Sequence, residues 1–264
     1  MPSRAQIIAT IGPASSGIDV LREMMTHQMD VARLNFSWGS HDEHARYISN
    51  IRLLAGEANK KIPIIQDLSG PRIQTGAGHK FDDASEIITD KDILDLRFGI
   101  EQNVDYVAMS FVGTDTDIVK MKDEIKKYGA RIPVIAKIER KIAIENIDNI
   151  LLVADAIMIG RGDMANDVPF EQIPFIQQEL INKSKAFKKP VIVATQMLLT
   201  MVNNPEPTRA ELTDVSQAIT QGADALMLSE ETAIGKYPAK AIDIMERLIL
   251  EAEKHGQTPD CCHL

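Results

Sequence analysis

Three charged residues near the middle of the chain, Lys137, Glu139 and Asp163, are spaced so that they could act together. Lys137 and Glu139 end one apolar segment, and Asp163 follows another, residues 156–159. On a strand, residues two apart point to the same side. Two carboxylates and an ammonium group at one point suit a hard divalent cation and a small anion. Simple ion pairs at the ends of two strands remain the alternative.

The elements that must position these residues follow from an alternation of apolar segments with segments of helical spacing. Short apolar segments separated by helices are typical of parallel strands that are buried on both faces. We predict strands at residues 7–12, 31–37, 62–68, 106–111, 134–139, 156–163, 190–195 and 225–229. We predict helices at residues 18–27, 41–58, 90–102, 115–128, 142–152 (interrupted), 170–187, from the capping residue Thr208 onward, and at 238–253.

Eight strands alternating with eight helices in 264 residues predict the α/β class and a single (β/α)8 TIM barrel. We assign residues 1–254 to the barrel and 255–264 to a C-terminal tail. In such a barrel, the catalytic residues lie at the C-terminal ends of the strands. Lys137, Glu139 and Asp163 are therefore expected at one mouth of the barrel.

Composition excludes several classes of function. A net charge of −9 argues against a general nucleic-acid or anionic-membrane surface, so local cations must hold any anionic substrate. No apolar segment approaches the length of a membrane span, and the N-terminus shows no signal peptide, so we expect a cytoplasmic protein. Cys261 and Cys262 are adjacent, which disfavours a disulfide. With His255 and His263 they could form a metal site, but we expect an exposed tail.

Further polar residues fall at the predicted strand ends. Arg33, Asn35 and Ser37 alternate with apolar neighbours, so they share one face of their strand. Backbone N–H groups after residue 160 could bind an anion, and Lys137 could stabilise the charge of an enolate. Thr195 and Ser229 could relay a proton to carbon. These residues together suggest a metal-bound 2-oxo acid that is enolised at the barrel mouth. The remaining polar groups at strand ends are Asp67, Ser110 and Glu231.

The same residues carry a family resemblance. Over nearly its whole length, and in order, the chain closely resembles pyruvate kinase. The family's barrel fold is implied as well. The matching motifs are residues 9–15, 33–37, 136–139, 161–163, 194–198, 204–211, 224–229 and 235–238.

The resemblance implies a role for each matching residue. Glu139 and Asp163 would bind magnesium or manganese, and Lys137 would face the enolate oxygen and the phosphoryl group. Arg33 would contact the phosphoryl group. The backbone of Gly160, Arg161 and Gly162, together with Thr195, would bind the substrate carboxylate. Ser229 and Glu231 would lie on the side from which the proton is donated. Asn35, Ser37 and Asp67 would match the ligands of the monovalent cation.

The chain departs from the family in ways that bear on the nucleotide. Family members insert a lid domain after the third strand, where this chain has only a short loop, residues 72–89, and they append a C-terminal regulatory domain. The lid's nucleotide-binding lysine has no counterpart, while Trp38 replaces a histidine and Gln74 an arginine. Charge-assisted contacts to phosphate are worth about 1.5–3 kcal/mol each, so we expect nucleotide affinity to collapse. Trp38 either roofs the substrate pocket or covers surface that the missing domain exposes.

Arg72 stands where potassium-dependent members have glutamate and potassium-independent members have lysine. A fixed guanidinium there could replace the monovalent ion, so we expect no potassium requirement. We also count Arg72 among the substrate-binding residues. Losing the C-terminal domain removes one association surface of the family, and a homo-oligomer stays open.

Three functions remain. We place first a magnesium-dependent enzyme that binds pyruvate, phosphoenolpyruvate or a related 2-oxo acid and makes or breaks a carbon–carbon bond through its enolate, as a decarboxylase or aldolase does. The alternative is a minimal pyruvate kinase that transfers phosphate between phosphoenolpyruvate and ADP. The third is a non-catalytic regulatory homologue, which the retention of Lys137, Glu139 and Asp163 disfavours.

Overall fold

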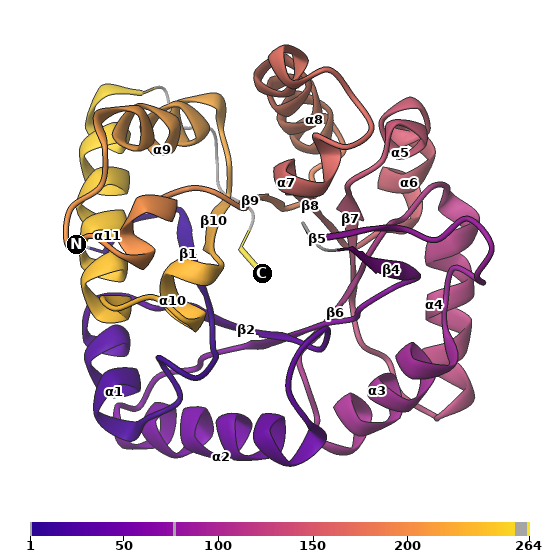
Figure 1. Ribbon diagram of the computed structural model, residues 1–264, viewed down its shortest axis with the longest axis horizontal. Helices are drawn as coiled ribbons and strands as arrows, with labels where there is room; N and C mark the ends of the chain where they lie inside the picture. Colours follow the sequence, from indigo (N-terminus) through magenta and orange to yellow (C-terminus); the bar gives the residue numbers. More distant parts are fainter. Residues whose placement is uncertain (1, 76–77, 257–262) are drawn as a thin grey trace.

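Eight parallel strands close into a barrel in the computed structural model, which describes residues 2–75, 78–256 and 263–264 (Figure 1). The strand order is β1-β10-β9-β8-β7-β6-β3-β2, so each strand is parallel to both of its neighbours. The predicted α/β class and TIM barrel are confirmed. The strands of the barrel are β1 (Gln6–Thr10), β2 (Val31–Asn35), β3 (Ile64–Asp67), β6 (Tyr106–Met109), β7 (Val134–Ile138), β8 (Ala156–Gly160), β9 (Val191–Ala194) and β10 (Ala225–Leu228).

Helices form the outer ring of the barrel (Figure 1). Capping boxes begin four of the described helices, at Ser40, Thr89, Thr114 and Thr208, each with an acidic residue three positions later that bonds back to the cap. The capping box predicted at Thr208 is confirmed. The helices are α1 (Ile18–Thr26), α2 (His41–Glu57), α3 (Asp90–Glu101), α4 (Asp115–Lys127), α5 (Lys141–Glu145), α6 (Ile147–Val153), α7 (Arg161–Met164), η1 (Phe170–Gln172), α8 (Ile173–Ala186), η2 (Leu199–Val202), α9 (Arg209–Gln221), α10 (Glu230–Ala233) and α11 (Pro238–His255).

Two apolar clusters divide the core. The smaller one fills the inside of the barrel, with Ile8, Val31, Ile65 and Ile135 among its members, and the larger one lies between the strands and the helices. Because side chains alternate along a strand, the residues two positions after these four also point inward. Those residues are Thr10, Arg33, Asp67 and Lys137. The interior is therefore apolar toward the N-terminal ends of the strands and polar toward their C-terminal ends.

At the end of the barrel where the strands begin, the same pair of hydrogen bonds joins four pairs of neighbouring strands. Asp30, immediately before β2, accepts a bond from Ile7 N–H at 2.8 Å, while its own N–H donates to the Ile7 carbonyl at 3.0 Å. The same reciprocal pair recurs between β3 and β6, β7 and β8, and β9 and β10. We call these four the aspartate pairs: Asp30 with Ile7, Asp105 with Ile64, Asp155 with Val134, and Asp224 with Val191.

Some predicted boundaries were wrong. Strand β8 ends at Gly160, and Asp163 lies in the helical turn α7 instead of on the strand. The chain from 72 to 89 is not only a loop, because β4 (Arg72–Thr75) and β5 (Gly78–Phe81) pair as an antiparallel hairpin. The helices do not alternate one to one with the strands, since short helical turns follow β8, β9 and β10.

The C-terminal end returns to the barrel. Helix α11 continues to His255, and Leu264 packs against the inner apolar cluster. The Leu264 N–H donates to Gln6 Oε1 at 2.9 Å. The prediction of exposed thiols at Cys261 and Cys262 lies outside the described residues. In the described part of the chain, no helix combines the length and apolar character needed to span a membrane.

Candidate active site

Lys137 occupies the centre of the polar end of the barrel. Its Nζ lies 3.0 Å from Glu139 Oε1 and 3.1 Å from Asp67 Oδ1, and it donates to Ser110 Oγ at 2.8 Å. The predicted convergence of Lys137 and Glu139 on one side of β7 is confirmed. Burial lowers the pKa of Lys137, but the charges of Asp67 and Glu139 more than offset this effect, so the net pKa is raised. Lys137 is therefore a fixed, buried cation.

Asp67 joins the two buried cations of the site. One oxygen faces Lys137, and the other accepts from Arg33 Nε at 2.7 Å. Arg33 is also fixed by Thr10, whose Oγ1 accepts from Nη1 at 2.9 Å. Burial would raise the pKa of Asp67, but the charges of Arg33 and Lys137 reverse this and lower it. Asp67 is consequently ionised, and both of its oxygens already have cationic partners.

Glu139 is held between a cation and a backbone amide. Its Oε2 accepts from Phe111 N–H at 2.9 Å, opposite the contact between Oε1 and Lys137. Burial raises the pKa of Glu139, Lys137 opposes this, and the neighbouring charge of Asp163 raises it further. Gly160 allows the close approach, because a Cβ there would lie 2.6 Å from Glu139 Cγ. The structure thus brings Asp163 into electrostatic reach of Glu139, as predicted, although from a helical turn.

These two carboxylates fit a divalent cation. Their mutual repulsion, which raises the pKa of Glu139, is what a positive ion between them would relieve. Oxygen donors are the ligands that Mg²⁺ prefers, and it commonly takes one or two carboxylates plus water and substrate oxygens. Among residues 2–75, 78–256 and 263–264, no cluster of three or more His, Cys, Asp and Glu side chains could hold a metal. Glu139 and Asp163 would therefore leave most of the coordination sphere to other ligands.

The segments after β8 and β9 are tied together by Arg161. Its side chain donates to the Thr195 carbonyl at 2.6 Å and to Asp214 Oδ1 at 2.7 Å. Thr195 Oγ1 in turn accepts from Gly162 N–H at 2.9 Å. Thr195 and Gln196 have φ angles of 69° and 56°, a left-handed conformation that costs about 1–2 kcal/mol per non-glycine residue. Arg161 therefore stabilises a strained turn, which agrees with a role for its backbone rather than its side chain.

Ser229 is positioned by Glu231. The buried carboxylate of Glu231 accepts from Ser229 N–H at 2.7 Å and from Leu198 N–H at 3.0 Å. Burial raises the pKa of Glu231. Ser229 Oγ is buried and has no hydrogen-bond partner among the described residues. Glu231 thus supports the loop, and the Ser229 hydroxyl is the group left to meet a ligand.

The loop after β2 carries the remaining predicted ligands. Asn35 Oδ1 accepts from Ser37 N–H at 3.1 Å, and within the described part of the chain Ser37 Oγ is buried without a partner. Trp38 follows and is 64% exposed. Arg72 Nε donates to the Ser69 carbonyl at 2.8 Å, and its charge lowers the pKa of Lys137, which places Arg72 near the site. The predicted role of Gln74 lies outside the described side chains.

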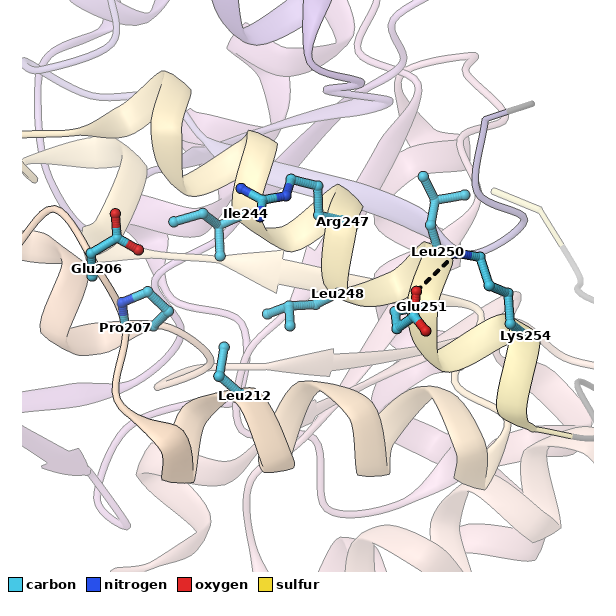
Figure 2. A pocket seen from close by; sticks show the side chains of 9 residues that line it. All are labelled: Glu206, Pro207, Leu212, Ile244, Arg247, Leu248, Leu250, Glu251 and Lys254. Atoms are coloured by element: carbon cyan, nitrogen blue, oxygen red, sulfur yellow. Dashed lines mark hydrogen bonds and ion pairs between the residues drawn. The ribbon is translucent and has the colours of Figure 1, made fainter.

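A groove elsewhere on the molecule is not part of this site. It has a volume of about 560 Å³ and lies between α9 and α11, on the outer ring of helices (Figure 2). Leu212, Ile244 and Leu248 provide apolar lining, while Glu251 and Lys254 pair with each other at its side. None of the predicted site residues lines it.

Comparison with known proteins agrees with the geometry of the strand ends. The family model described as "Pyruvate kinase, barrel domain" matches residues 2–88 and 81–242. The chain belongs to the pyruvate kinase family. A pyruvate kinase of Geobacillus stearothermophilus is 36% identical over 96% of this chain, and one of Agrobacterium vitis is 36% identical over 96%. A pyruvate kinase of Thermotoga maritima is 33% identical over 94%.

The chain covers only part of the length of each of these relatives. It spans 58% of the Geobacillus protein, 70% of the Agrobacterium protein and 71% of the Thermotoga protein. The Geobacillus alignment extends over 338 positions, more than the 264 residues of this chain, so that relative has residues inside the aligned region that this chain lacks. The two matched segments of the family model meet at residues 81–88, directly after the β4–β5 hairpin.

Three partners in this site were not predicted from the sequence. Ser110 was recognised as a strand-end residue but was given no role, although it accepts a bond from Lys137. Thr10 fixes Arg33, and the only signal was its place at the end of the first apolar segment. Phe111 acts through its backbone N–H at a φ of 56°, which the identity of its side chain does not indicate.

Proposed function

We propose that the protein is a magnesium-dependent enzyme that binds phosphoenolpyruvate or pyruvate and stabilises the enolate between them. In this proposal it transfers the phosphoryl group from phosphoenolpyruvate to a nucleoside diphosphate, or in reverse from a nucleoside triphosphate to the enolate of pyruvate. The names of its relatives favour this function over the carbon–carbon lyase that we placed first. The observation that carries it is the buried Lys137, held between Asp67 and Glu139. An ammonium group in that position is already oriented toward the place where negative charge develops.

The neighbouring residues have complementary tasks. Arg33, fixed by Asp67 and Thr10, offers the remaining guanidinium nitrogen to a phosphoryl group. The turn at Gly160–Gly162, with Thr195, would receive the carboxylate of the substrate. When bound between Glu139 and Asp163, the divalent cation would supply positive charge to the oxygens of the substrate. The unpartnered Ser229 hydroxyl is suited to move a proton toward carbon.

A site for a monovalent cation would lie near the loop after β2. Asn35 Oδ1 and the free Ser37 Oγ could contribute to such a site, but both Asp67 oxygens face cations already. Arg72 lies near Lys137 and supplies a fixed positive charge. We therefore propose activity without potassium.

The decisive assay couples ADP phosphorylation by phosphoenolpyruvate to a spectroscopic readout at saturating ADP and magnesium, with and without potassium. We expect turnover that Lys137→Met abolishes. Absence of turnover in the unchanged protein would reject the kinase reaction. Calorimetry with oxalate and magnesium, an enolate mimic with its cation, would then report whether the enolate site itself exists.

A second candidate is favoured by the β4–β5 hairpin. A hairpin of two four-residue strands follows β3, and the exposed Trp38 lies beyond β2. Two four-residue strands are far smaller than a domain that could enclose a nucleotide and exclude water from it. If the protein exchanges the methyl protons of pyruvate in deuterated water but makes no ATP, a lyase acting on a 2-oxo acid is the better assignment. No exchange above the level of Lys137→Met would reject both enolate functions.

A further inference from the structure

The β4–β5 hairpin is joined to the barrel by a row of four side chains in contact. Arg72 and Phe81 face each other across the base of the hairpin, where their Cα atoms are paired. Phe81 and Phe111 have ring centroids 5.6 Å apart. The Arg72 guanidinium carbon lies 5.6 Å from the Phe111 ring, and that of Arg140 lies 3.6 Å from the Phe81 ring. The order Arg140, Phe81, Phe111, Arg72 thus alternates between hairpin and barrel, and we call these four residues the clamp.

The clamp is built around a residue in an unusual conformation. Phe111 has a φ of 56°, which a bulky residue adopts only when its surroundings hold it there. Its ring is held by Phe81 and Arg72, and its carbonyl accepts from Arg140 Nη1 at 3.4 Å. Both the ring and the carbonyl of Phe111 therefore contact clamp residues. A strained residue with these supports removed would relax.

The same conformation aims the Phe111 N–H at Glu139. That N–H donates to Glu139 Oε2 at 2.9 Å, and Glu139 Oε1 contacts Lys137 at 3.0 Å. If Phe111 relaxed, its N–H would turn, and Glu139 would lose this hydrogen bond while keeping its contact with Lys137. The carboxylate would then be free to rotate toward the ammonium group.

We propose that Phe81 and Arg140 are positioning residues, which act through Phe111 to hold the Glu139 carboxylate in its working orientation. The hairpin that stands beside the site is then a fixed support for Glu139, and it has this role whether or not it also covers substrate. This inference depends on the proposed function in one respect, namely that Glu139 binds a divalent cation. Arg140 also links the hairpin to Glu139 through the backbone, because Glu139 is the residue directly before Arg140 in the chain.

The first test uses the metal-free protein and amide hydrogen exchange followed by NMR. In Phe81→Leu and Arg140→Gln, we expect the protection of the Phe111 amide to fall at least tenfold, while amides of β7 keep theirs. Phe81→Tyr, which preserves the stacked ring, should retain protection. The matched control is Phe175→Leu, the same change at a ring that is 77% exposed on α8, and it should have no effect. Unchanged protection of Phe111 in both clamp variants would overturn the proposal.

The second test measures Mn²⁺ binding by electron paramagnetic resonance. We expect Phe81→Leu and Arg140→Gln to weaken binding about tenfold while Phe81→Tyr and Phe175→Leu leave it unchanged, a pattern that general loss of structure would not produce. Equal Mn²⁺ affinity in all four variants and the unchanged protein would overturn the positioning role. Glu139→Gln separates the two ideas: if it leaves Mn²⁺ binding intact, the proposed cation site fails, whereas the exchange result for Phe111 still decides whether the clamp exists.

Discussion

The two ends of the barrel use acidic residues in opposite ways. At the N-terminal end, each aspartate pair satisfies a carboxylate with a backbone N–H of the adjacent strand, and the result is a regular pattern. At the C-terminal end, Asp67 and Glu139 face the buried cations Arg33 and Lys137, and strained residues lie nearby. Buried charges that face one another are costly to assemble and are typical of sites that must bind or react. The contrast indicates that one end maintains the fold and the other carries out the chemistry.

Lys137→Met should have the largest effect on activity. Removing a preorganised charge from the reacting centre typically lowers the rate by about 10²–10³. Lys185→Met is the matched change at the other end, because Lys185 pairs with Asp224 at 2.5 Å. That variant should lose roughly 1–3 kcal/mol of stability and keep its turnover per folded molecule. Coupled assays and urea unfolding on both variants measure this, and a similar loss of turnover in both would break the comparison.

Gly160→Ala should weaken cation binding next most. The added Cβ would lie 2.6 Å from Glu139 Cγ, so the carboxylate must move. We expect Mn²⁺ affinity to fall by at least about tenfold, which corresponds to about 1.4 kcal/mol. Gly56→Ala, where a Cβ meets no atom within 4 Å, is the control and should bind Mn²⁺ normally. Normal binding by Gly160→Ala would mean that Glu139 is not a ligand.

Asp30→Asn should show that Asp30 stabilises the folded protein less than the other members of the aspartate pairs do when its carboxylate is ionised. Burial raises the pKa of Asp30 to about 6, and the charge of Glu246 adds to this, whereas Asp155 has Lys122 at 2.8 Å. The folded state therefore binds the Asp30 proton more tightly than the unfolded state does. The resulting stability is present below pH 3.8 and is lost as the pH rises through 6.

Replacing Asp30 by the neutral amide should then stabilise the protein at pH 8, by on the order of 2 kcal/mol, and have little effect near pH 4. Thermal unfolding at the two pH values measures the difference. Asp155→Asn removes an ion pair instead, so it should give no gain at pH 8. A gain in both variants would show that burial alone, and not the missing cation, separates the four pairs.

Gln196→Gly should give the smallest change. Gln196 is exposed and has a φ of 56°, which glycine adopts freely, so we expect a gain of about 0.5–1 kcal/mol. Gln102→Gly is the comparison, since its φ of −82° offers no strain to relieve, and it should destabilise the protein. Chemical denaturation measures both, and a loss of stability in Gln196→Gly would argue against stored strain at this end.

The barrel could be predicted from the sequence because the pattern of apolar and polar residues that indicates it repeats along the chain. Apolar strands recur between helices, and the capping signal at Thr208 is local, so neither depends on distant contacts. Boundaries were less accurate where a strand runs directly into a helical turn, as at Gly160, since both states tolerate the same residues. The hairpin at 72–81 was missed because its strands are short and polar and have few apolar residues to set a period.

The candidate site was predicted by residue type and only partly by contact. Lys137 and Glu139 share a strand face, which the two-residue spacing fixes. The pairing of Asp67 with both Arg33 and Lys137 depends on how three strands align in the closed barrel, and the sequence carries no record of that register. The backbone N–H of Phe111 could not be predicted, because left-handed conformations of bulky residues have no sequence signature.

The aspartate pairs also indicate where the sheet should open first. At three of the boundaries between strand pairs, the residue that precedes the strand is a proline, Pro63, Pro133 or Pro190, which accepts a bond through its carbonyl but has no N–H to return. Each of those boundaries therefore begins with a single bond, whereas each aspartate pair begins with two. Transient opening under native conditions should accordingly separate the barrel into two-stranded units.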